Sequence, residues 1–285
     1  MIISVASGKG GTGKTTIATN LACSFDTETV ELLDCDVEEP NAHLFLKPEI
    51  TGCETVSTPV PLVDEQQCTG CRKCSAICRF NAITVVGQKV LVFPELCHGC
   101  GGCMEVCPEA AITEQSRNLG IVEFGRRGAL TAVSGRLRVG EAMSPPLIKA
   151  VRAQAGKRPL TIIDAPPGTS CPVISAMKGT DFVVLVTEPT PFGLHDLVLA
   201  HEAVKLLGIP CGLVINRAGM GDDRTHAYAE TSGLPILMEI PFDRRIAECY
   251  SRGQLMVKAL PEWSGRFRTM YGRIEQLVHE QGGTA

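Results

Sequence analysis

The feature that most limits the fold of this chain is a glycine-rich segment near its N-terminus. Residues 7–16 read Ser-Gly-Lys-Gly-Gly-Thr-Gly-Lys-Thr-Thr and directly follow a short apolar run, residues 2–6, that predicts a buried strand. A helix is expected from the end of this segment to about Phe25. A strand, a glycine loop and a helix in this order form a phosphate-binding loop, because the backbone N–H groups and the helix N-terminus face the phosphates. The order predicts an α/β fold that binds a nucleotide.

The loop also supplies the polar ligands that such a site needs. Lys14 is placed to contact the β- and γ-phosphates, and the Thr15 hydroxyl is placed to ligate Mg²⁺. Asp164 ends a strongly apolar run, residues 160–164, and resembles the carboxylate that holds Mg²⁺ through water; a cap on the following turn is the alternative role. The other loop residues predicted to contact the nucleotide are Gly8, Lys9, Gly10, Gly11, Thr12, Gly13 and Thr16.

Strands and helices alternate through most of the remaining sequence. Strands are expected at about 29–34, 120–124, 129–139, 160–164, 181–187, 211–215 and 234–240. Helices are expected at about 145–155, 193–207, 223–232, 243–251 and 261–280, the last with an apolar stripe at helical spacing. This alternation predicts a mostly parallel sheet flanked by helices on both faces.

A cysteine-rich segment interrupts the alternation and contains an internal repeat. Cys68-x₂-Cys71-x₂-Cys74-x₃-Cys78 recurs 29 residues later as Cys97-x₂-Cys100-x₂-Cys103-x₃-Cys107, and an Ala-Ile pair begins four residues after the last cysteine of each run. Short β-like stretches occur at 83–86 and 90–93. We therefore expect an inserted α+β module at residues 58–116, between two parts of the nucleotide-binding domain at 1–57 and 117–285.

Each cysteine run resembles the bacterial ferredoxin signature, Cys-x₂-Cys-x₂-Cys-x₃-Cys-Pro. Arg79 replaces the proline in the first run, whereas Pro108 retains it in the second. In ferredoxins with two clusters the fourth cysteine of each run ligates the other cluster. The resemblance thus implies two [4Fe–4S] clusters. Cys68, Cys71, Cys74 and Cys107 would hold one, and Cys78, Cys97, Cys100 and Cys103 the other. Zinc is the alternative, but its sites more often show two separated cysteine pairs.

A second lysine inside the phosphate loop narrows the class of nucleotide-binding protein. The run Lys9-Gly-Gly-x-Gly-Lys14-Thr-Thr resembles the deviant loop of the MinD/ParA/Mrp and nitrogenase iron protein ATPases. The resemblance extends over the chain outside the insertion, through 34–36, 164–169, 214–217 and 240–243. Together with the cysteine runs, it indicates the group of MinD-like ATPases that carry an inserted ferredoxin domain.

This resemblance implies roles for several residues. Lys9 would reach the nucleotide of a partner subunit, so an ATP-dependent homodimer is expected, with Lys9, Lys14 and Asp36 as the catalytic residues. Asp36 would orient the attacking water, while Asp34 would be structural or a more distant magnesium partner. Asn216 would recognise adenine, with Pro241 beside the nucleotide. The sequence after Asn216 lacks the aspartate of guanine-binding motifs, which favours ATP over GTP.

The cysteines outside the two runs give weaker signals. Cys23, Cys211 and Cys249 fall on expected helices or strands and are predicted to be ordinary core or near-core residues. Cys171 follows Asp164 by seven residues, a spacing that resembles the cluster-ligating switch cysteine of the nitrogenase iron protein. The iron protein needs a second such cysteine, and no convincing one is found here.

Composition excludes several other classes of function. The net charge is −4 and no run of Lys or Arg could neutralise a row of phosphates, so no nucleic-acid partner is expected. No window reaches the ~18–20 apolar residues of a membrane helix, and no signal peptide is recognised, so a cytoplasmic protein is predicted. Fourteen cysteines in a reducing compartment favour metal ligation over disulfides.

Three functions remain open at this point. The first is ATP-gated electron transfer to a redox partner protein, the second is assembly or carriage of metal clusters, and the third is a positioning ATPase with redox-sensing clusters. Two complete four-cysteine sets leave no labile ligand for delivery, and no Cys-x-x-Cys pair lies outside them. Neither a membrane-targeting terminal helix nor DNA-contacting basic residues are visible. Electron transfer is therefore the leading hypothesis.

Overall fold

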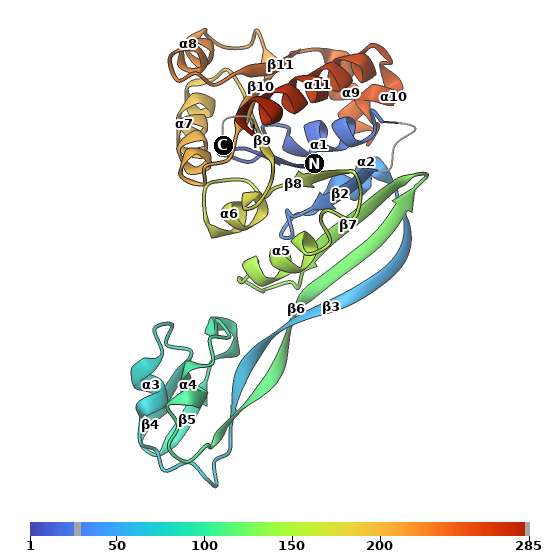
Figure 1. Cartoon of the computed structure of the whole chain (residues 1–285). Helices are drawn as coiled ribbons and strands as arrows, with labels where there is room; N and C mark the ends of the chain where they lie inside the picture. The colour runs from blue at the N-terminus through green and yellow to red at the C-terminus, as the bar shows by residue number, and fades with distance from the viewer. Residues whose placement is uncertain (26–29, 283–285) are drawn as a thin grey trace.

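A sheet with mostly parallel strands organises the molecule, as the computed structural model of residues 1–25 and 30–282 shows (Figure 1). The expected start of the second strand, Thr29, lies outside the described residues. Within them, the strand order is β11-β10-β9-β1-β8-β2-β7-β6-β3. The seven strands from β11 to β7 are parallel neighbours, and the last two, β6 and β3, are antiparallel. The parallel strands are β1 (Ile2–Ala6), β2 (Val30–Asp34), β7 (Leu130–Leu137), β8 (Leu160–Asp164), β9 (Phe182–Thr187), β10 (Cys211–Ala218) and β11 (Ile236–Pro241).

The central strands form where the sequence is apolar on both faces. All residues of β2, β8 and β9 are buried, which is typical of parallel strands covered by helices on both sides. The register places Asp34 of β2 directly beside Asp164 of β8. Two carboxylates predicted from separate segments therefore meet at the edge where these strands end.

Helices cover both faces of the sheet, as predicted. On one face Ile17 of α1 and Phe267 of α11 pack in one core cluster with Ile3 of β1; on the other, Val151 of α5 and Leu197 of α7 pack in a second cluster. The expected stripe on the last helix is confirmed, because Phe267, Met270 and Ile274 are buried. The helices are α1 (Lys14–Ala22), α2 (Ala42–Leu46), α5 (Pro145–Arg152), α6 (Cys171–Met177), α7 (Pro191–Leu206), α8 (Arg224–Thr231), α9 (Arg244–Ser251), α10 (Met256–Ala259) and α11 (Glu262–Gly282).

The antiparallel edge of the sheet extends into a long two-stranded ribbon that the sequence did not predict (Figure 1). β3 (Glu49–Val63) pairs with β6 (Ile112–Arg127) along its whole length, whereas only a short strand near 120–124 was expected. Most β3 residues before Thr58 are exposed, so this strand lacks the apolar alternation by which half-buried strands are recognised. The expected module boundaries at 58 and 116 fall inside the ribbon, one position out of register, because Thr58 pairs with Arg117.

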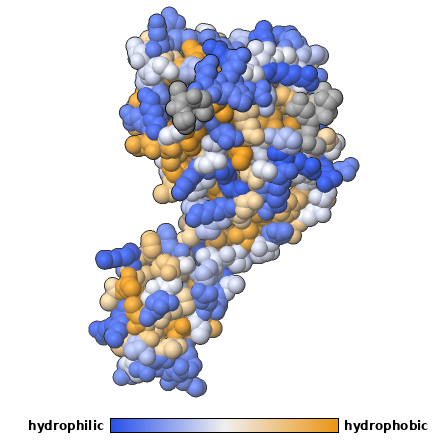
Figure 2. Space-filling view, viewed as in Figure 1, coloured by the Kyte–Doolittle hydropathy of each residue, from blue (hydrophilic) through white to orange (hydrophobic). Residues whose placement is uncertain are grey.

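The cysteine-rich segment forms a small lobe at the end of the ribbon, separated from the main body by a narrow neck (Figures 1 and 2). It contains α3 (Lys73–Ile77), the hairpin β4 (Ile83–Val86) and β5 (Lys89–Val92), a 3₁₀ turn at Pro94–Leu96, and α4 (Gly102–Glu105). Ile83, Ile112 and several cysteines form its core. In the part of the chain that the structure describes, no helix has the length and apolar character needed to cross a membrane.

Phe267→Ala should test how much the long C-terminal helix contributes to the core. Phe267 is 0% exposed, and truncating a fully buried phenylalanine costs about 3–5 kcal/mol through lost burial and the cavity left behind. Phe192→Ala is the matched control, since Phe192 is 79% exposed and its loss should change stability by less than about 0.5 kcal/mol. Urea unfolding of both variants measures the difference; equal effects would contradict the packing described.

Candidate functional site

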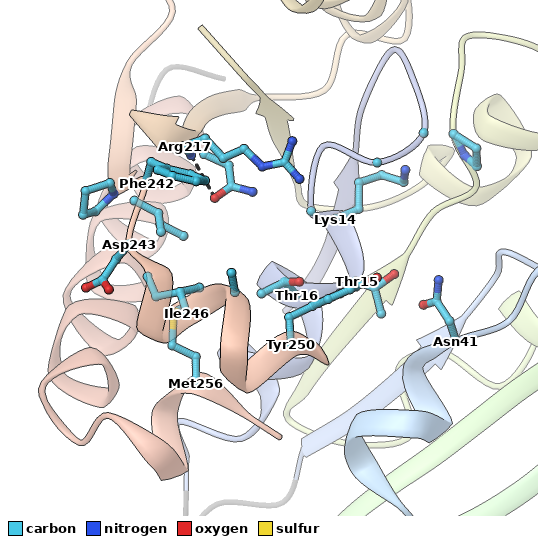
Figure 3. Close-up of a pocket in the computed structure, with 18 of the residues that line it drawn as sticks. Lys14, Thr15, Thr16, Asn41, Arg217, Phe242, Asp243, Ile246, Tyr250 and Met256 are labelled. Atoms are coloured by element: carbon cyan, nitrogen blue, oxygen red, sulfur yellow. Dashed lines mark hydrogen bonds between the residues drawn. The ribbon is translucent and has the colours of Figure 1, made fainter. Parts of the chain in front are cut away.

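A cleft at the carboxyl edge of the parallel strands collects the residues that follow several of them. It is lined by the phosphate loop, the segment after β2, the end of β10, and the start of α9. In Figure 3, Lys14 and Thr15 lie on one side of the cleft and Phe242 and Ile246 on the opposite side. Ligands of parallel α/β sheets bind at this edge, because helix N-termini and loop residues converge there.

Two close contacts explain why the phosphate loop needs its glycines. Gly13 has φ +100°, and a Cβ there would lie 2.5 Å from Nδ2 of Asn216. That Nδ2 donates a hydrogen bond of 2.8 Å to the carbonyl oxygen of Thr12. A Cβ on Gly8 would lie 2.1 Å from the carbonyl oxygen of Asp196 in α7. The loop is therefore held against β10 and α7 before any ligand arrives.

Three charged groups lie together at the base of the loop. Burial lowers the pKa of Lys14, while Asp164 and Asp36 oppose this shift. Burial raises the pKa of Asp164 to about 7, against the effects of the Thr15 hydroxyl and Lys14. Both carboxylate oxygens of Asp164 are buried, and no hydrogen bond of normal geometry reaches them from the described residues. A buried carboxylate without donors, next to a threonine hydroxyl, suits a divalent cation with its water shell.

Asp34 and Asp36 have different environments despite their proximity in sequence. The Asp34 carboxylate accepts N–H groups of Asp36 (3.1 Å), Asn41 (3.1 Å) and Ala42 (3.0 Å), so it fixes the turn that leads into α2. Asp36 is half-buried and lines the cleft, and burial raises its pKa to about 6 while Lys14 lowers it. Asp36 is thus the carboxylate of the two that can reach a ligand.

The structure gathers most, but not all, of the predicted nucleotide residues around the cleft. Gly10, Gly11, Gly13, Lys14, Thr15, Thr16, Asp36, Asn216 and Pro241 line it. Gly8, Lys9 and Thr12 belong to the same loop without lining the cleft, and Asp164 lies beneath it. The sequence analysis missed the wall formed by Phe242, Ile246, Tyr250 and Met256. The sequence did contain a signal for this wall, since α9 directly follows a strand that ends at this edge.

The small lobe contains two further cavities, each lined by one of the predicted cysteine sets. The outer cysteine site consists of Cys68, Cys71, Cys74 and Cys107, and the inner cysteine site of Cys78, Cys97, Cys100 and Cys103. In each, the fourth cysteine comes from the other run of the repeat, as the ferredoxin resemblance implied. Over residues 1–25 and 30–282, no three His, Cys, Asp or Glu side chains are grouped so that they could hold a single metal ion. Four thiols around a cavity have the donor number and chemistry that a [4Fe–4S] cluster requires.

Aromatic stacking distinguishes the surroundings of the inner cysteine site. Phe80 and His98, both lining this cavity, stack with ring centroids 3.6 Å apart. The positions 29 residues away, Glu109 and Thr69, line the outer cavity instead.

Cys171 is exposed at the start of α6 and is not part of either set, while Cys211 is half-buried and Cys249 is buried.

Comparisons with known proteins agree with this geometry. The family model described as the CobQ/CobB/MinD/ParA nucleotide binding domain (CbiA) matches residues 3–256. Uncharacterized protein MJ0579 of Methanocaldococcus jannaschii is 32% identical over 267 residues, covering 90% of this chain and 92% of that protein. The iron-sulfur cluster carrier protein of the same organism is 24% identical over 294 residues, covering 97% and 84%. The structure of septum site-determining protein MinD with Mg-ADP, from Pyrococcus horikoshii, has a TM-score of 0.61 at 22% identity and covers 97% of this chain and 96% of that one.

The strand, phosphate loop and helix, with a parallel sheet and acidic residues at its carboxyl edge, define a P-loop nucleotide-binding protein with an α/β fold. The chain belongs to the CobQ/CobB/MinD/ParA family, and its fold is that of the MinD/ParA nucleotide-binding ATPases.

Asp36→Asn should stabilise the nucleotide-free protein at pH 7.5. Because burial raises the pKa of Asp36 to about 6, folding favours the neutral form; this stabilisation is complete below pH ~4 and is lost as pH rises through about 6. Asparagine remains neutral, so it keeps the stabilisation at high pH. Discounting for the part of the carboxyl group that water still reaches, the gain at pH 7.5 should be about 1 kcal/mol.

The measurement is urea unfolding at pH 4 and pH 7.5. Asp222→Asn is the control, because an ion pair with Arg224 lowers the pKa of this exposed carboxyl group and no gain at pH 7.5 is expected. If Asp36→Asn raises the free energy of unfolding as much at pH 4 as at pH 7.5, burial of the Asp36 charge is not the cause.

Proposed function

We propose that this protein is a Mg²⁺-dependent ATPase that holds two [4Fe–4S] clusters and couples a nucleotide-dependent homodimer to electron transfer with a partner protein. The observation that carries the proposal is the pair of cavities in the small lobe, each lined by four cysteines. The ATPase part rests on the family, and the cluster part rests on the thiol sets.

The residues of the cleft suit ATP hydrolysis. Backbone N–H groups of the phosphate loop and the Lys14 ammonium would bind the phosphates, and Thr15 with Asp164 would hold Mg²⁺. Mg²⁺, when bound, neutralises charge on the phosphates. Asp36 would orient the water that attacks the γ-phosphorus, so that ATP and water give ADP and inorganic phosphate. One amide hydrogen of Asn216 is donated to the Thr12 carbonyl oxygen, so the second would be free to bind the adenine base.

The position of Lys9 supports a role between two subunits. Lys9 is half-buried on the phosphate loop but does not line the cleft of its own chain. In a face-to-face dimer its ammonium would contact the nucleotide of the second copy. Such a dimer would form with ATP and relax after hydrolysis, which supplies the two states that a switch requires.

The cysteine sets favour electron transfer over delivery of the clusters. The chemistry that a bound [4Fe–4S] cluster supplies is one-electron transfer. One electron would arrive from a low-potential donor and leave to the partner protein, so the bound clusters end in their starting state. All four thiols of each set line one cavity, so each bound cluster would have a complete set of four cysteine ligands.

Cluster carriage is the second candidate, because a relative named iron-sulfur cluster carrier protein matches 97% of this chain. In that case the clusters would be cargo that passes to an apo-protein. The two candidates differ in a measurable way, since electron transfer leaves iron on this chain and carriage removes it.

Anaerobic reconstitution tests the proposal. The chain should bind about eight irons, and an ATP analogue should shift the midpoint potential or the EPR spectrum of the reduced protein relative to ADP. Incubation with a cluster-free ferredoxin should leave the iron in place. An iron content well below eight per chain would overturn the proposal, and so would a midpoint potential and an EPR spectrum that do not change with the nucleotide. ATP-dependent loss of iron to the ferredoxin would establish carriage instead.

Lys9→Ala should prevent dimerisation without affecting the clusters. Light scattering with a non-hydrolysable ATP analogue should report a dimer for the unaltered chain and a monomer for the variant, while iron content stays the same. Lys178→Ala, which removes an exposed lysine far along the chain, should still dimerise. A Lys9→Ala variant that dimerises fully would contradict the face-to-face arrangement.

A further inference from the structure

The two cysteine sites differ in how they contact the ribbon. Val60 of β3 packs in one buried cluster with Cys97, and Cys78 packs against that cluster. Gly99 lies in the loop between Cys97 and Cys100, and a Cβ on it would be 2.6 Å from Oγ1 of Thr58 and 3.2 Å from the carbonyl oxygen of Pro59. The loop of the inner cysteine site is thus seated directly on β3.

The internal repeat provides a matched comparison for this contact. Gly70 occupies the position in the first run that Gly99 occupies in the second, and both have positive φ, +69° and +65°. A Cβ on Gly70 would have Cα of Gln88, within the small lobe, as its nearest neighbour at 3.5 Å. The corresponding loop of the outer cysteine site therefore packs on its own lobe and not on β3.

A buried ion pair anchors the ribbon next to this contact. Thr58 pairs across the ribbon with Arg117 of β6, which is 8% exposed. Arg117 forms an ion pair with Glu141, whose side chain is 0% exposed, and Arg138 lies 3.5 Å from the same carboxylate oxygen. Nε and Nη2 of Arg117 are buried without a hydrogen-bond partner among the described residues, so its charge depends on Glu141.

The segment that carries Glu141 also contacts the catalytic edge. The N–H group of Leu137 donates a hydrogen bond of 2.8 Å to the carbonyl oxygen of Val37, the residue after Asp36. The N–H group of Arg138 donates one of 2.8 Å to the carbonyl oxygen of Leu119 in β6. Residues 137–141 therefore contact the Asp36 segment at one end and the ribbon at the other.

We propose that nucleotide state regulates the inner cysteine site selectively, through residues 137–141, the Arg117–Glu141 ion pair and the seating of the Gly99 loop on β3. This rests on the proposed function and adds which of the two sites responds. A change at Asp36 moves Val37 and the segment bonded to it. The buried ion pair passes the shift to the ribbon, because separating its charges is costly in a low-dielectric environment. The outer cysteine site, which lacks the contact with Thr58, keeps its environment.

Single-site variants test the selectivity. Cys71→Ser leaves only the inner set complete, and Cys100→Ser leaves only the outer set. After anaerobic reconstitution, iron release to a ferrous chelator is measured with ADP and with a non-hydrolysable ATP analogue. The rate should differ about fivefold or more between nucleotides for the inner site, and should be the same for the outer site.

Hydrogen exchange of the unaltered holoprotein gives the same comparison without cysteine substitutions. Amides 98–102 should change protection between nucleotides, and amides 69–73 should not. Equal responses at both sites, or a response of the outer site alone, would overturn the selective regulation and leave the proposed function standing. Absence of any response at either site would overturn the proposed function itself.

Substitutions at the ion pair test the route. Glu141→Gln keeps the shape of the side chain and removes its charge, so the nucleotide response should fall to less than about a third while iron content and ATP binding remain. Glu123→Gln is the control, because Glu123 lies on the same strand as Arg117 and forms a partly exposed ion pair with Arg136. A full response in Glu141→Gln would overturn the route.

A second pair of variants keeps the test valid if Glu141→Gln fails to fold. Gly99→Ala and Gly70→Ala carry the same strain from positive φ, but only the first places a methyl group against Thr58. Gly99→Ala should alter the nucleotide response of the inner site, whereas Gly70→Ala should preserve it. Identical responses in the two variants would show that the seating on β3 is not involved.

Discussion

The buried ammonium of Lys14 lies near two carboxylates, Asp36 and Asp164, at the edge where the parallel strands end. Burial lowers the pKa of Lys14 and raises those of Asp36 and Asp164, so these charges are poorly solvated. Phosphate oxygens would pair with the ammonium, and a divalent cation would pair with the carboxylates. Burial of these charged groups costs free energy, which a ligand that pairs with them would offset.

The segments around these charged groups are the ones from which the ribbon begins. Asp34 holds the turn into α2 through three backbone N–H groups, and β3 starts three residues after α2 ends. The other strand of the ribbon, β6, pairs with β7, which itself pairs with β2. Both strands of the ribbon are therefore connected to the strand that carries the acidic residues, one through the chain and one through the sheet.

The sequence predicted the parts of the molecule whose local pattern is strong. The glycine loop, the apolar runs of β8 and β9 and the stripe on α11 each have a pattern that follows from the element itself, and the structure contains all of them. The crossed grouping of Cys107 with the first cysteine run could also be expected, because the internal repeat resembles a known arrangement. The Phe242–Met256 wall was missed although α9 directly follows a strand that ends at this edge, because its residues are spread over the segment after β11, α9 and α10 and line one cleft only in the folded chain. The ribbon was missed because most β3 residues before Thr58 are exposed, so this part of the strand carries no periodic signal.

The position of β3 at the end of the sheet order has a consequence for how copies of the protein meet. A 15-residue edge strand presents a row of unpaired backbone groups to solvent, which is a common starting point for unwanted strand-to-strand aggregation. Pro59 and Pro61 are two positions apart and so face the same way along the strand, and neither has an N–H group to donate. They remove donors from the outer edge just where the ribbon reaches the small lobe. Sheet extension by a neighbouring chain is thereby blocked at the point where it would cover the inner cysteine site.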